Sequence, residues 1–182
     1  MSSIIINNQG IWINGIQENA LVFTADLHQN LTLLYKYLEI DYSKFYKMDH
    51  LSKLAFLGVE FLAKSVDLTA YKDDDIGLHF QNVSSSLDTD ITHQQNIDNN
   101  GKARPATFVY TLPNIALGEI AIRNQWFGEN LFTLSERFDL DAWQQISQAL
   151  LDANKCVAVI GGWVEVLEDK MDLQLHFHAK AE

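Results

Sequence analysis

The stretch KMDHLSKLAFLGVEFLAKS, residues 47–65, constrains the fold more than any other part of this sequence. Asp49 is a suitable N-cap, and apolar side chains recur after it at helical spacing. They form one wide face, made of Leu51, Leu54, Ala55, Leu57, Gly58, Phe61 and Leu62. A helix with so wide an apolar face has to pack on another layer of structure. The sequence therefore predicts a core helix over residues 47–65.

Shorter segments on both sides of this helix show the periodicities of strands and of further helices. Strands are predicted at 4–6, 11–13, 76–81, 131–134, 156–160, 163–167 and 171–179, with Gly161-Gly162 interrupting the fifth and sixth. Helices are predicted at 26–38, about 112–126 and 139–154. The polar residues 83–101 predict a loop with one helical turn after Ser86. This order indicates a single α/β domain over residues 1–182, with a mixed sheet and helices packed on it.

Charge and cysteine content narrow the classes of function. The chain has 182 residues and a net charge of −11, which repels nucleic-acid phosphates and anionic lipids. We therefore expect no nucleic-acid partner and no membrane binding. The single cysteine, Cys156, cannot form an intrachain disulfide, and the segment MSSIIINNQG does not have the pattern of a signal peptide. We expect a cytoplasmic protein.

Four segments in a fixed order carry a resemblance to a known family. They are FYKMDHLSKLAFLGVEFLAK, NVSSSLDTD, TFVYTLPNIALGEIAIRNQWFGE and AVIGGWVE. In this order the chain, from about Phe45 onward, resembles the N-terminal half of a β-ketoacyl synthase, the condensing enzyme of the thiolase fold. The resemblance implies a thiolase-like half-fold, with a mixed five-stranded sheet and packed helices.

The position of the family's nucleophile is the main departure from this resemblance. In the family, a cysteine at the start of the third helix forms the acyl thioester. Here that position falls on Glu136 or Arg137, neither of which can form a thioester. Cys156 lies about five helical turns further on. The family's two histidines belong to the C-terminal half, and His176 and His178 are in the wrong place to substitute. The resemblance thus implies that condensing activity is absent, with no catalytic residue, metal or cofactor expected.

These implications favour a non-catalytic accessory or regulatory protein in fatty-acid, polyketide or aryl-polyene type biosynthesis. Chain-length factors, which are family relatives, also lack the cysteine and pair with an active synthase. Expected partners are a condensing enzyme or another lipid-pathway protein. Family dimers form through the strand before the nucleophile, here Leu131–Leu134, so a homodimer through this edge is an alternative. Acyl carrier proteins are acidic, and an acidic domain disfavours binding them directly.

Two other functions stay open at this point. A repurposed hydrolase-type enzyme would use the loop Ser84–His93, where Asp88, Asp90 and His93 could converge, although such residues more often make turn and cap hydrogen bonds. A small module that binds an acyl or aromatic ligand would be lined by Trp126, Phe132 and Trp163, although aromatic residues at these spacings are more often core.

Glu119 and Arg123 are spaced for an ion pair within one helix, which is a structural role.

Overall fold

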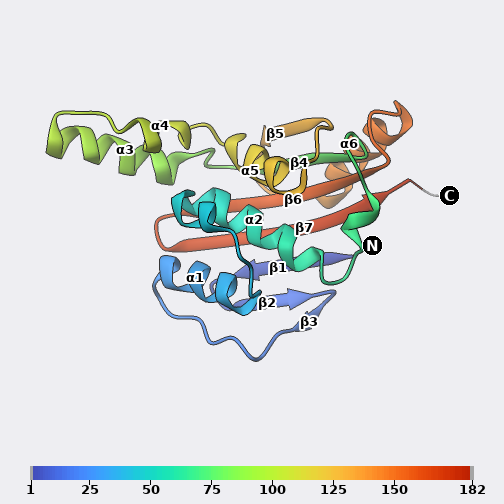
Figure 1. Cartoon of the computed structure of the whole chain (residues 1–182), viewed down its shortest axis with the longest axis horizontal. Helices are drawn as coiled ribbons and strands as arrows, with labels where there is room; N and C mark the ends of the chain where they lie inside the picture. The colour runs from blue at the N-terminus through green and yellow to red at the C-terminus, as the bar shows by residue number, and fades with distance from the viewer. Residues whose placement is uncertain (1, 181–182) are drawn as a thin grey trace.

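The computed structural model describes residues 2–180, and in this range the strands form one seven-stranded sheet of order β3-β2-β1-β7-β6-β4-β5 (Figure 1). β4 runs parallel to both β5 and β6, and the other neighbouring pairs are antiparallel. The strands are β1 (Ser3–Asn7), β2 (Gly10–Ile13), β3 (Ile16–Gln17), β4 (Ile76–Asn82), β5 (Asn130–Leu134), β6 (Ala158–Leu167) and β7 (Lys170–Ala179). The expected mixed sheet with packed helices is confirmed.

The sheet is wider than the expected five strands. β1 pairs antiparallel with β7, with Ile4 opposite Leu175, so that the N-terminal hairpin continues the sheet. The two-residue strand β3 then adds to the far side of β2. Periodicity along the chain shows where strands lie but not which of them pair. The number of strands in one sheet therefore could not be read from the sequence.

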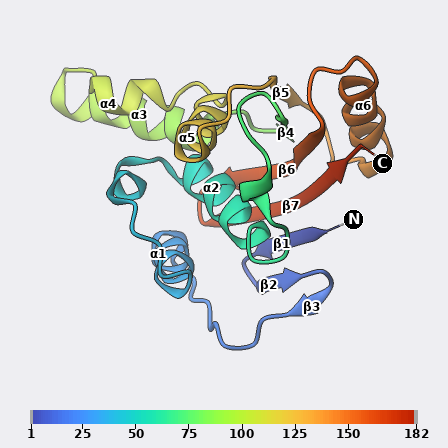
Figure 2. The same cartoon turned by 45° about the vertical axis from the view of Figure 1, so that its right-hand side comes forward.

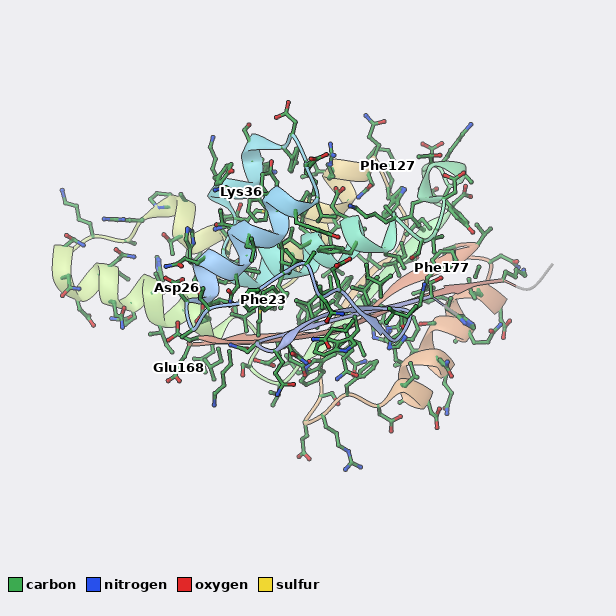
Figure 3. All side chains as sticks on the ribbon, turned by 90° about the horizontal axis from the view of Figure 1, so that it is seen from below. Phe23, Asp26, Lys36, Phe127, Glu168 and Phe177 are labelled. Atoms are coloured by element: carbon green, nitrogen blue, oxygen red, sulfur yellow. The ribbon has the colours of Figure 1, made fainter. Side chains whose placement is uncertain are left out.

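Helices cover the two faces of the sheet unequally. α1 (Leu27–Tyr37), α2 (His50–Leu62) and α5 (Ile115–Asn124) lie on one face, and α6 (Leu140–Asp152) lies on the other; Figure 3 shows the sheet nearly edge-on between α1 and α6. Two short 3-10 helices occupy Ser43–Lys47 and Leu68–Ala70. No helix within residues 2–180 combines the length and the apolar character needed to cross a lipid bilayer.

α2 is the core helix that the sequence predicts. The Asp49 side chain accepts a hydrogen bond of 2.9 Å from the backbone N–H of Ser52, which confirms it as the N-cap. Eleven of the thirteen residues of α2 are buried, and the helix packs on β1, β6 and β7. The large core cluster of the protein lies at this contact and contains most of the buried hydrophobic residues.

The segment expected as a loop forms a long polar helix. α3 (Leu87–Asn100) and α4 (Pro105–Val109) form a hairpin that projects from the sheet (Figures 1 and 2). Thr89 is the one buried residue in α3, so no apolar stripe reveals the helix in the sequence. The helix is held by local contacts, such as Gln94 to Asp98 at 2.8 Å, and it ends at Gly101 with φ of 65°.

Candidate functional site

The turn between β5 and α6 is where the resemblance puts the nucleophile. Glu136 and Arg137 both lie there with exposed side chains. The Ser135 N–H donates to the carbonyl of Asn82 at 2.8 Å, which ties the turn to the end of β4. On the other side, the Asp139 carboxylate accepts from the Ala142 N–H at 3.1 Å and caps α6. The turn thus joins the end of a strand to the capped start of a helix.

The side chains of this turn are unsuited to thioester chemistry. It presents a carboxylate and a guanidinium, and the hydroxyl of Ser135 donates to the Arg137 carbonyl at 2.7 Å instead of to a base. Cys156 lies beyond the other end of α6 and is 5% exposed. Burial raises the pKa of its thiol, which keeps it protonated and a weak nucleophile.

Two buried histidines lie beneath α6, next to this turn. His79 of β4 and His176 of β7 are both register partners of Gly161, so they flank this glycine on the same face of the sheet. The Trp143 indole lies 6.2 Å from the His79 ring and 5.8 Å from the His176 ring, measured between centroids. Phe138 stacks on His176 at 5.7 Å. Sequence reasoning missed His79, because a single histidine in an apolar strand carries no spacing signal.

The histidine cluster packs the second face of the sheet and is closed to substrate. His79 is 0% exposed and His176 is 9% exposed. Both nitrogens of His176 and Nδ1 of His79 have no hydrogen-bond partner among the described residues. Burial lowers the pKa of His79 from 6.5 to about 4, and also lowers the pKa of His176. Both imidazoles are therefore neutral at neutral pH.

We expect His79 to withdraw stability from the fold as the pH falls from 7 to 5, whereas the raised pKa values of Asp49 and Asp172 act in the opposite direction. The pKa of His79 is depressed in the folded state, so below pH 6.5 the unfolded chain binds a proton that the folded chain excludes. At pH 5 this lowers the free energy of unfolding by about 2 kcal/mol, and His176 acts in the same direction. Urea unfolding at pH 7 and pH 5 measures the difference.

The variant His79→Phe should remove about 2 kcal/mol of this pH dependence, because phenylalanine supplies an aromatic ring that does not titrate. The same replacement at the exposed His28 is the control. Equal pH dependence of stability in the wild type and His79→Phe would show that His79 is not its source.

The segment Ser84–His93 comprises the three residues before α3 and the first seven residues of α3. Asp88 accepts from the backbone N–H of Glu168 at 3.0 Å and pairs with His50 at 3.2 Å. The Ser86 hydroxyl donates to the Thr111 carbonyl at 2.7 Å, and its oxygen lies 3.3 Å from the Asp90 carboxylate.

The ring of His93 lies 5.8 Å from Phe108 of α4. Within residues 2–180, no hydrogen bond or ion pair joins any two of Asp88, Asp90 and His93. The hydrolytic role suggested for them stays a prediction.

The three candidate aromatic residues are divided between the two faces of the sheet. Trp126 is 3% exposed and belongs to the large core cluster, and Phe132 packs against the same cluster. Trp163 is 6% exposed and lies on the α6 side, with its ring 6.4 Å from that of Phe138. The three side chains therefore do not share one pocket, and a ligand-binding role for them stays a prediction. The described residues bring together no group of three histidine, cysteine or acidic side chains that could hold a metal.

The expected ion pair between Glu119 and Arg123 is wrong. Glu119 is 4% exposed, pairs with Lys44 at 2.7 Å and accepts from the Tyr110 hydroxyl at 2.9 Å. Arg123 instead pairs with Glu60 of α2 at 3.1 Å. Because Glu119 faces the protein interior, it takes partners from other segments rather than from its own helix.

β5 is an edge strand of the sheet. It pairs with β4 alone, so its other side has no partner strand within the described part of the chain. Leu134, at the end of β5, is 63% exposed, and Val83, which follows the last residue of β4, is 51% exposed. An open strand edge next to exposed apolar side chains is suited to association.

Solved structures of other proteins share this architecture. A structure described as the ishigamide ketosynthase/chain length factor matches with a TM-score of 0.69 and 12% identity, over 99% of this chain and 61% of that chain. A ketosynthase (ApeO) in complex with its chain length factor (ApeC) from Xenorhabdus doucetiae matches with a TM-score of 0.56 and 15% identity, over 79% and 63%. A type II PKS acyl-carrier protein in complex with its ketosynthase bound to the hexaketide (AntDE:AntF) matches with a TM-score of 0.61 and 12% identity, over 96% and 60%.

These similarities concern the fold. The chain spans about three fifths of the length of each matched protein. No family model and no curated protein matches the sequence. The chain thus has the thiolase-like fold of ketosynthase and chain length factor proteins.

Proposed function

We propose that this protein is a non-catalytic, ketosynthase-like accessory or regulatory subunit that pairs with an active condensing enzyme in fatty-acid, polyketide or aryl-polyene biosynthesis. The observation that carries the proposal is the turn between β5 and α6. It joins a strand to a helix where the resemblance puts the nucleophile, and it carries Glu136 and Arg137 and no cysteine. We infer that a fold without a cysteine at this turn serves binding rather than catalysis.

The matched proteins support a partner of this kind. One of them is a ketosynthase in complex with its chain length factor, and another is a ketosynthase in complex with an acyl carrier protein. Of these two partners, the charge of −11 disfavours the acidic carrier protein. A condensing enzyme is therefore the partner that we propose.

The edge of β5 is the surface that we propose for pairing. An incoming strand would complete the hydrogen bonds of the open edge and give main-chain affinity. Leu134 and Val83 would add apolar contact at the same end of the strands. A second copy of this chain could use the same edge, so the test has to separate the two partners.

Native pull-down with wild-type and Leu134→Asp chains tests the proposal. We expect the wild type to copurify with a condensing enzyme in equal amounts, and the variant to lose it, because a charge would be desolvated at the contact. Ile122→Asp on α5 is the matched control, because Ile122 and Leu134 are both 63% exposed. This variant should keep the partner.

Light scattering and an activity assay complete the experiment. The purified chain alone should show no condensing turnover. Condensing activity of the isolated chain, or a homodimer that captures no condensing enzyme, would contradict the proposal. Loss of the partner from both aspartate variants would contradict pairing through β5.

A further inference from the structure

A small cavity lies away from the β5–α6 turn, where the N-terminus of α2 meets α3 and α4. Its volume is about 240 Å³, and its walls include Met48, Lys53, Asp88, Thr89, Ala106 and Tyr110. This volume corresponds to about eight water molecules at roughly 30 Å³ each. The cavity is therefore large enough for a small metabolite.

Lys53 in the wall of this cavity has no acceptor among residues 2–180. The residue is 5% exposed, and its ammonium lies 5.6 Å from the centroid of the Phe45 ring. No hydrogen bond or ion pair to Lys53 is found within residues 2–180. Buried lysines are ordinarily paired, because an unpaired buried charge is costly. Burial accordingly lowers the pKa of Lys53.

The carboxylates near Lys53 already have other partners. One oxygen of Asp49 accepts from the Ser52 N–H at 2.9 Å, and the other accepts from the Thr89 hydroxyl at 2.7 Å. Asp88 pairs with His50 at 3.2 Å and accepts from the Glu168 N–H at 3.0 Å. The ammonium of Lys53, which Asp49 attracts without forming a hydrogen bond or an ion pair, is thus a buried donor left for a ligand, beside the exposed Lys47 in the same walls.

We propose that this cavity binds the carboxylate of a small organic monoacid on the ammonium of Lys53. Met48, Ala106 and the threonine methyl groups would contact a short apolar body. The carboxylates of Asp49 and Asp88 in the same walls oppose a second negative charge, which disfavours phosphate. This site does not depend on the pairing proposed for β5.

Titration with ligands of one size and different charge tests the site. Sodium butyrate, butyramide, n-butylamine and inorganic phosphate are each added to labelled protein, and the backbone amide shifts are followed by NMR. Butyrate should shift the amides of Lys53, Thr89 and Thr107 in a saturable way, with a dissociation constant of roughly 1–10 mM. Butyramide should bind at least about tenfold more weakly, since it lacks the charge.

Three outcomes of the ligand series would overturn all or part of the proposal. No saturable butyrate shift, or tighter binding of n-butylamine, would overturn the carboxylate site. Tighter binding of phosphate would overturn the assignment to monoacids.

Lys53→Met separates the site from a structural role of the lysine. The variant keeps the length of the side chain and removes the charge, so butyrate affinity should fall at least about tenfold. The melting temperature of the variant shows whether it is folded. Lys102→Met, at an exposed position between α3 and α4, is the matched control and should leave both quantities unchanged. Wild-type butyrate affinity in folded Lys53→Met would overturn the proposal.

Discussion

Gly161→Ala is expected to disrupt the pairing of β6 with β4 in the interior of the sheet. β6 lies between β4 and β7, and Gly161 stands opposite His79 on one side and His176 on the other. A Cβ atom at Gly161 would lie 1.8 Å from the carbonyl oxygen of His79 and 2.5 Å from its carbonyl carbon. These are backbone atoms of a paired strand, so no side chain can move aside to make room. We expect a loss of about 4 kcal/mol or more in the free energy of unfolding.

Gly118→Ala is the matched control for this prediction. Gly118 lies in α5, and a Cβ atom there would meet no heavy atom within 4 Å. Alanine should stabilise the helix by about 0.5–1 kcal/mol. Far-UV circular dichroism and urea midpoints compare both variants with the wild type. A Gly161→Ala chain with the wild-type midpoint would show that β4 and β6 do not pair in this register.

Local sequence patterns predict most helices and strands of this fold, but they do not predict which strands pair. The apolar face of α2 and the cap at Asp49 are visible as spacing, and the structure confirms both. The pairing of β1 with β7 joins residues far apart in the chain, which no local pattern records. α3 was missed because its stability comes from polar contacts along the helix and from its position beside α4, rather than from an apolar stripe.

Candidate site residues could likewise be predicted only where their position follows from the order of elements along the chain. The positions of Glu136 and Arg137 follow from their order along the chain, between a strand and a helix cap. Lys53 could not be singled out, because it sits on α2 among apolar residues and its lack of a partner depends on which hydrogen bonds Asp49 makes. Such a site is defined by contacts between α2 and α3, and these are set by tertiary packing.

Trp143→Ala is expected to detach α6 from the sheet, with a loss of about 3–5 kcal/mol in the free energy of unfolding. Trp143 is 0% exposed and is the largest residue of the small cluster on this face, with Leu151, Cys156 and Val159. Its indole N–H donates to the carbonyl of His79 at 2.9 Å, and its ring covers His79 and His176. Urea unfolding, with the near-ultraviolet circular dichroism of the tryptophans, measures the loss.

Trp143→Phe separates packing from the hydrogen bond. Phenylalanine keeps much of the apolar volume and loses the indole N–H, which leaves the His79 carbonyl without this donor at a cost of about 1–3 kcal/mol. We expect this variant to lie between the wild type and Trp143→Ala. A loss below about 1 kcal/mol for Trp143→Ala would contradict the packing of α6 on the sheet, since removing a large buried side chain leaves a cavity. Since α6 follows the turn that carries Glu136 and Arg137, its detachment should also weaken any partner contact that includes this turn.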